Sequence, residues 1–180
     1  MRKFNAILVI LIFILLIDHI IFGGMHLLGL NVSVTKQMAL LMLFLVLAHA
    51  VISMFVTLKA EKAGAKTKAR YNKENREFWA RRTSGMMILV FGLLHAYAMF
   101  KDENGVPRIA RLPRIFSLVT PLLIISIYTH IFANVRPLLI SLGIRNMEKK
   151  EKIIKIILTI IMLFAIGALI YFDVMRSRGH

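Results

Sequence analysis

The chain contains no cysteine. This absence excludes disulfides, iron–sulfur clusters held by the chain, thiolate-ligated haem and covalently attached c-type haem. Any metal site therefore uses nitrogen, oxygen or methionine sulfur. Acidic residues are also scarce: 9 Asp and Glu stand against 24 Lys and Arg, which gives a formal charge of +15.

Hydrophobic residues make up 58% of the 180 residues, whereas a soluble domain of this length needs a far more polar surface. We therefore expect one integral membrane domain, residues 1–180. About 20 apolar residues in a helix cross a hydrocarbon core of ~30 Å, and the chain has five such stretches. The predicted fold is all-α, with transmembrane helices at about residues 4–30, 38–58, 83–100, 114–135 and 153–172, the first four forming a four-helix bundle.

The basic residues gather between the apolar stretches, mainly in residues 59–82 and 136–155. If the N-terminus lies in the cytoplasm, 17 of the 24 basic residues face the cytoplasm and 7 the other side. Because Lys and Arg concentrate on the cytoplasmic side, we predict a cytoplasmic N-terminus and an outside C-terminus. Residues 59–82 are expected to be partly helical, and residues 101–113 to form a turn-bearing loop.

Each of the first four apolar stretches carries a histidine inside the span, at His19, His49, His95 and His130. Counted from the span ends, His19 and His95 fall in the outer half of the membrane, and His49 and His130 toward the inner half. Haem iron accepts an imidazole on each side, and a four-helix bundle can hold a cofactor between facing helices. The pattern favours two haem b groups at two depths, which would form an electron path across the membrane.

Other interpretations of these histidines remain open. A single histidine in a membrane helix is more often a hydrogen-bonded packing residue or a proton-relay group. A haem-free proton-coupled transporter or membrane scaffold is thus the main alternative. A diiron enzyme would need clustered His-x-x-His or Glu-x-x-His motifs, which the sequence lacks, and a zinc site fits poorly with histidines at two levels.

Further candidates surround the histidines. His26 lies seven residues after His19, on the same helix face, so it is an alternative haem ligand or a quinone or proton site. Asp18 is the only carboxylate well inside a span, and it either accepts a proton or is held by a neighbouring helix. Near the inner end, haem propionate contacts are expected from Arg81, Arg82, Ser84, Asn134 and Arg136, whose alternative role is interfacial anchoring.

Two stretches are similar to a known family. Arg82-Thr83-Ser84-Gly85 followed by His95 resembles the Arg-x-(Ser/Thr)-Gly…His helix of the cytochrome b membrane anchor of succinate dehydrogenases and fumarate reductases. Residues 130–143 resemble that family's His-x-x-x-Gly-x-Arg-x-Leu-x-x-x-x-Gly segment, with Asn134 where a glycine is common. The similarity covers the third and fourth stretches, and the first two match by one histidine each.

The resemblance implies the single-chain, five-helix, dihaem type of anchor. In that type the first helix pairs with the third and the second with the fourth, so the axial ligands would be His19 with His95 and His49 with His130. This pairing agrees with the depths of the histidines.

The resemblance also implies partners and a substrate. A flavoprotein subunit and an iron–sulfur subunit would dock on the cytoplasmic face, against residues 59–82 and the region after the fourth span. The quinone of this type is often menaquinone. The glutamate that such proteins use near the quinone in the second span is missing, because residues 40–58 contain no carboxylate. Asp18 or His26 would have to replace it.

We therefore expect a dihaem cytochrome b in a bacterial or archaeal cytoplasmic membrane. It would pass electrons between a quinone and a peripheral succinate dehydrogenase or fumarate reductase, as a non-catalytic subunit, and a dimer of such complexes is compatible with this type. A b-type cytochrome that serves another oxidoreductase, such as a hydrogenase, would keep the same histidines and differ in its co-purifying subunits.

Overall fold

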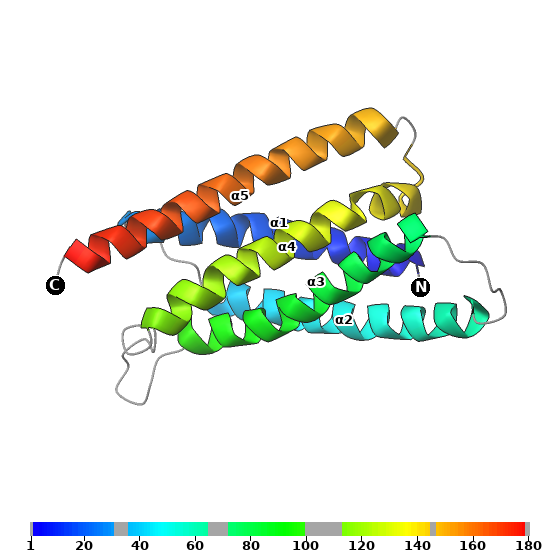
Figure 1. Cartoon of the computed structure of the whole chain (residues 1–180), viewed down its shortest axis with the longest axis horizontal. Helices are drawn as coiled ribbons and strands as arrows, with labels where there is room; N and C mark the ends of the chain where they lie inside the picture. Colours follow the sequence, from blue (N-terminus) through cyan, green and yellow to red (C-terminus); the bar gives the residue numbers. More distant parts are fainter. Residues whose placement is uncertain (1, 31–35, 65–71, 100–112, 145–146, 179–180) are drawn as a thin grey trace.

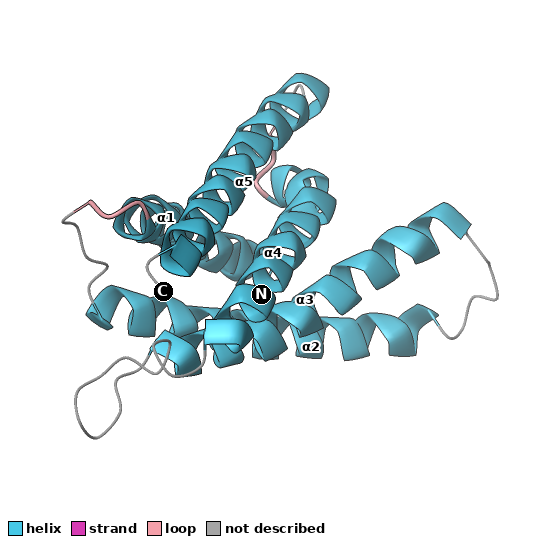
Figure 2. Ribbon diagram, turned by 60° about the vertical axis from the view of Figure 1, so that its left-hand side comes forward, coloured by secondary structure: helices cyan, strands magenta, loops and turns pink. Residues whose placement is uncertain are grey.

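The computed structural model describes residues 2–30, 36–64, 72–99, 113–144 and 147–178, and every regular element in these ranges is an α-helix (Figures 1 and 2). The helices are α1 (Arg2–Leu27), α2 (Lys36–Gly64), α3 (Asn72–Met99), α4 (Pro113–Ser141) and α5 (Met147–Arg178). Figure 1 shows that α1 begins and α5 ends at opposite ends of the bundle. The all-helical class predicted from the sequence is thus confirmed for the described residues.

Within the described ranges, four helices are long and apolar enough to cross a membrane, through Phe4–Leu27, Gln37–Val56, Phe116–Ser141 and Met147–Met175. Large apolar side chains on them face outward: Phe44 is 66% exposed and Leu118 is 68% exposed. A water-soluble monomer rarely exposes so much apolar surface, so this surface identifies a membrane protein. α3 is not among the four, because its N-terminal part (residues 72–82) is mostly polar.

A glycine follows the C-terminal end of α1 and of α4, and the apolar pattern of the sequence did not predict these two helix ends. Gly29 and Gly143 have positive φ angles of 82° and 70°. In both turns the N–H of the next residue donates to the carbonyl oxygen five residues earlier, at 3.1 Å, which closes the helix end. α1 therefore stops at Leu27, before the predicted span end at about residue 30, and α4 continues to Ser141, beyond the predicted span end at about residue 135.

The polar flanks of the apolar stretches are helical as well. α2 continues to Gly64, α3 begins at Asn72 rather than 83, and α5 extends beyond both predicted ends (153 and 172). Pairs such as Glu77 with Arg81 (3.7 Å) support these flanks, because residues four apart are neighbours on a helix. The partial helicity predicted for residues 59–82 is confirmed where the structure describes them. The predicted loop of residues 101–113 lies outside the described residues, apart from Pro113.

The first four helices form a quadrilateral with α5 on one side of it. α1 packs along α2, α3 packs along α4, and α2 approaches α3 more loosely. α5 packs against both α1 and α4 and covers the fourth side, where these two helices touch only briefly. There Leu158 of α5 is buried with Val135 and Leu139 of α4, and Phe13 of α1 packs against this cluster.

The diagonals of the quadrilateral are open. In the described helices, no Cα atom of α1 lies within 8 Å of α3, and none of α2 lies within 8 Å of α4. Any side chains that meet across these diagonals therefore meet in the interior of the bundle.

Candidate functional site

Two pairs of histidines meet across the two diagonals. His19 of α1 and His95 of α3 have ring centroids 6.2 Å apart, with ring planes at 78°. His49 of α2 and His130 of α4 have ring centroids 6.4 Å apart, with planes at 81°. The structure thus brings together the same two pairs that the sequence and the family resemblance predict.

The two pairs lie at different levels of the bundle. On α1, Asn5 contacts His49 and lies 14 residues before His19, a rise of ~21 Å along a helix. On α3, Ser84 contacts His130 and lies 11 residues before His95, a rise of ~16 Å. The centres of the two pairs are therefore separated by roughly 15–20 Å along the helix axes.

The His49 ring is held through one nitrogen. Its Nδ1 lies 3.0 Å from Oδ1 of Asn5, so an Nδ1–H donates to this amide oxygen. That tautomer leaves the lone pair on Nε2, which has the Ser53 hydroxyl at 3.4 Å. Metal-ligating histidines are commonly oriented by such a bond from the other ring nitrogen.

His130 is held against the backbone of α3. Its Nδ1 lies 3.1 Å from the Arg81 carbonyl oxygen, to which the N–H donates, and 3.2 Å from the Ser84 hydroxyl oxygen. The Ser84 hydroxyl in turn donates to a carbonyl one turn earlier on α3, at 2.6 Å. The ring fits closely because Gly85 has no side chain: a Cβ there would lie 3.2 Å from Cε1 of His130.

The other level has one oriented ring and one unpaired nitrogen. His95 Nδ1 lies 3.3 Å from the Thr120 hydroxyl, and Phe116 stacks on the His95 ring at 5.8 Å between centroids. His19 Nδ1 is buried and has no hydrogen-bond partner in the part of the chain that the structure describes. An unsatisfied buried polar atom costs about 1–3 kcal/mol of stability. A ligand bound to this nitrogen would remove the cost, and so would a rotation of the His19 ring when the ring binds a ligand.

The geometry can be tested against a metal held between two imidazoles. With a metal–nitrogen bond of ~2.0 Å on each side and the ring centroid a further ~1.2 Å away, the two centroids lie at most ~6.4 Å apart. The observed 6.2 and 6.4 Å match this value. Among the described residues, no group of three or more His, Cys, Asp or Glu could hold a metal ion. Each level offers only two imidazole ligands. Two ligands suit haem, whose iron takes its other four nitrogen ligands from the porphyrin.

His26 and Asp18 belong to neither of the two ring pairs. His26 is exposed in the last turn of α1, and the structure brings His19, not His26, to His95. Asp18 is half-buried and projects about 100° around the helix from its neighbour His19.

Of the five residues expected to contact haem propionates, three contact His130 and two are described by other surroundings. Arg81 and Ser84 contact His130, through a carbonyl and a hydroxyl as described above. Arg82 lies with its guanidinium 4.9 Å from the Phe78 ring centroid. Asn134 donates from Nδ2 to the His130 carbonyl oxygen at 2.7 Å, and Arg136 is exposed.

Three side chains that contact His49 or His95 from neighbouring helices were not predicted from the sequence: Asn5 at His49, and Thr120 and Phe116 at His95. Asn5 carried a readable signal: it is a polar residue inside an apolar run, 14 residues and nearly four turns from His19, on the same face of α1. Thr120 had none, because threonine is common in membrane helices.

No protein-family model, curated protein or solved structure matches the chain. The membership in the cytochrome b anchor family therefore stays a prediction from the two motifs.

Proposed function

We propose that the chain is a dihaem cytochrome b membrane anchor that carries electrons between a membrane quinone and a peripheral succinate dehydrogenase or fumarate reductase. The observation that carries the proposal is the meeting of two histidine pairs across the two diagonals, at centroid distances of 6.2 and 6.4 Å. His19 and His95 would hold one haem b, and His49 and His130 the other. When bound, each haem supplies a one-electron redox centre.

The residues of the chain orient the ligands and set their basicity. Asn5 and the Arg81 carbonyl each accept a hydrogen bond from the Nδ1–H of a histidine, which fixes the ring and leaves Nε2 as the donor atom. Such bonds raise the electron density on the ligating nitrogen, and so they tune the potential of the iron. The apolar helices exclude water from both levels.

The orientation and the partners follow from charge. In the proposed topology the His49–His130 level lies nearer the cytoplasm, and the N-terminus is inside. In addition to the four apolar helices, α3 would also cross the membrane, with its apolar part (residues 83–99) alongside α4. The flavoprotein and iron–sulfur subunits would dock on the basic cytoplasmic face, in a bacterial or archaeal cytoplasmic membrane, alone or as a dimer of complexes. The proposed electron donor or acceptor is a membrane quinone of the menaquinone type.

The experiment is a reduced-minus-oxidised spectrum of the detergent-purified chain, with a pyridine haemochrome count. We expect about two b haems per chain. A chain from haem-replete cells without a Soret band would contradict the proposal and favour a haem-free proton relay. The co-purifying subunits then identify the partner. We expect a flavoprotein and an iron–sulfur protein, whereas a co-purifying hydrogenase would point to another oxidoreductase.

A further inference from the structure

An open groove of about 540 Å³ lies outside the histidine-bearing interior, between α4 and α5 near the turn that joins them. One end of the groove is charged and is formed by Glu148, Glu151, Lys152 and Lys155 of α5. These four residues belong to neither histidine pair.

The groove changes from charged to apolar along α5. Beyond the charged end, its walls are formed by Ile156, Thr159 and Ile160 of α5 and by Phe132 of α4, and the Thr159 hydroxyl donates to the Lys155 carbonyl oxygen at 2.8 Å. The apolar side chains Ile156, Ile160 and Phe132 are exposed, at 50%, 61% and 39% respectively. The change follows the axis of a helix that is apolar enough to cross the membrane. The charged end therefore lies at the level of the lipid headgroups, and the apolar walls lie at the level of the acyl chains.

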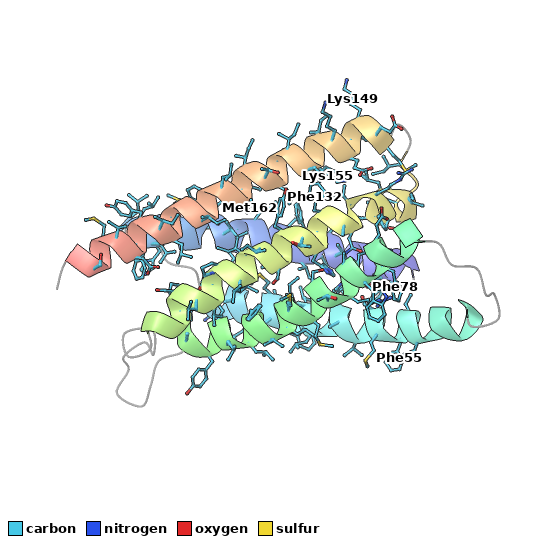
Figure 3. All side chains as sticks on the ribbon, viewed as in Figure 1. Phe55, Phe78, Phe132, Lys149, Lys155 and Met162 are labelled. Atoms are coloured by element: carbon cyan, nitrogen blue, oxygen red, sulfur yellow. The ribbon has the colours of Figure 1, made fainter. Side chains whose placement is uncertain are left out.

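The charged end is ordered by specific contacts. Lys155 Nζ lies 2.5 Å from Glu151 Oε1 and 4.3 Å from the centroid of the Phe132 ring. Figure 3 shows Lys155 and Phe132 in the space between α4 and α5, and Lys149 on the outer side of α5. An ammonium has three donors and a carboxylate about four acceptor sites, so this pair retains capacity for a ligand of either charge.

The charge of the site selects its ligand. Two carboxylates and two ammonium groups line it, so its formal charge is zero. A purely anionic headgroup would meet two carboxylates at close range. A headgroup with a phosphate and a primary ammonium matches both signs, because Lys152 and Lys155 can bind the phosphate and Glu148 and Glu151 can accept from the ammonium.

We propose that the groove binds a phospholipid with a primary ammonium headgroup, of the phosphatidylethanolamine type. Its acyl chain lies along Ile156, Ile160 and Phe132. A quaternary choline headgroup has the same charge but no N–H to donate, so it binds more weakly. The bound lipid fills the groove where α4 and α5 leave the membrane. This proposal does not depend on haem.

Native mass spectrometry of the detergent-purified full chain tests it. Phosphatidylethanolamine, phosphatidylcholine and phosphatidylglycerol with identical acyl chains are titrated in competition. We expect phosphatidylethanolamine to be retained about tenfold more strongly than the other two, since hydrogen bonds to charged groups are worth roughly this factor. Equal retention of the three lipids, or preference for phosphatidylglycerol, overturns the proposal.

The variants Glu151→Gln and Glu148→Gln locate the site. Each should reduce the retention of phosphatidylethanolamine several-fold and should bring it closer to that of phosphatidylcholine. Lys149→Gln is the matched control on the outer side of α5 and should change nothing. If neither glutamate variant alters the headgroup preference, or if the groove variants instead abolish a dimer seen in the same spectra, the lipid is not the occupant. Because the wild-type competition needs no variant, a misfolded substitution leaves the test intact.

Discussion

The His49 and His130 rings lie 6.4 Å apart between their centroids, although no Cα atom of α2 lies within 8 Å of α4 in the described helices. His19 and His95 have the same relationship across α1 and α3, at 6.2 Å. The bundle thus keeps each diagonal pair of backbones apart, and one pair of imidazoles meets across each diagonal. Helices that pack only for stability would be expected to approach one another along small residues instead.

Gly85 and Gly92 lie on the same helix, α3, but differ in the space that an added side chain would find, so they serve as a test position and its control. An added Cβ at Gly85 would lie 3.2 Å from His130 Cε1, whereas one at Gly92 would lie 4.0 Å from its nearest neighbour, Leu123. We expect Gly85→Ala to push the His130 ring and to shift the reduction potential and the electron paramagnetic resonance signal of one haem. Gly92→Ala should leave both haems unchanged. A redox titration followed optically checks this, and identical titrations for the two variants would contradict the close fit at His130.

Asn5 and Thr120 allow each level to be perturbed separately. Asn5→Leu removes the acceptor for His49 Nδ1, and Thr120→Val removes the hydroxyl beside His95 Nδ1. Loss of such an orienting partner typically weakens metal binding about 10–100-fold. Each variant should therefore lower the occupancy or shift the potential of one haem, and the two variants should affect different haems. If both altered the same haem, the assignment of these residues to separate levels would be wrong.

His19 and His26 are distinguished by single substitutions. The structure places His19 opposite His95 and leaves His26 exposed in the last turn of α1. We expect His19→Ala to lose about one of the two haems and His26→Ala to retain both. The pyridine haemochrome count per chain measures this. The reverse pattern would show that His26 is the ligand.

Packing between α1 and α5 depends on Gly24. A Cβ there would lie 2.7 Å from the Phe164 ring, whereas an added Cβ at Gly167 meets nothing within 4 Å. Overpacking costs about 1–3 kcal/mol, so Gly24→Ala should lower the apparent melting temperature in detergent by several degrees. Gly167→Ala should leave it unchanged or raise it slightly, because alanine favours the helix. Equal melting temperatures for the two variants would argue against the close α1–α5 contact.

Much of this architecture can be predicted from the sequence. Long apolar runs set which segments are helical, and the distances of the histidines from the run ends predicted which histidines share a level. The structure brings His19 to His95 and His49 to His130, as that depth argument requires. Depth is informative because an α-helix rises by a constant ~1.5 Å per residue, and the family resemblance implies the same pairing.

The helix ends and the neighbours of the histidines were harder to predict. Apolar runs stop where the membrane stops, but α3 and α5 continue into polar flanks with charge pairs such as Glu77 with Arg81. α4 passes Pro137 and ends at Ser141, in a turn closed by Gly143, whose positive φ no hydrophobic pattern reveals. Which side chain of a neighbouring helix contacts a histidine depends on helix rotation, and for this reason Thr120 was missed.

The most direct test of the account is haem retention in two double variants. His19→Ala/His95→Ala removes both members of one pair, and His95→Ala/His130→Ala removes one member of each. If each pair holds one haem b, the first variant should retain about one haem per chain, and this haem should keep its low-spin spectrum. The second variant should retain no six-coordinate low-spin haem. If instead the first variant loses both low-spin haems and the second retains one, the histidines are paired differently and the account is wrong.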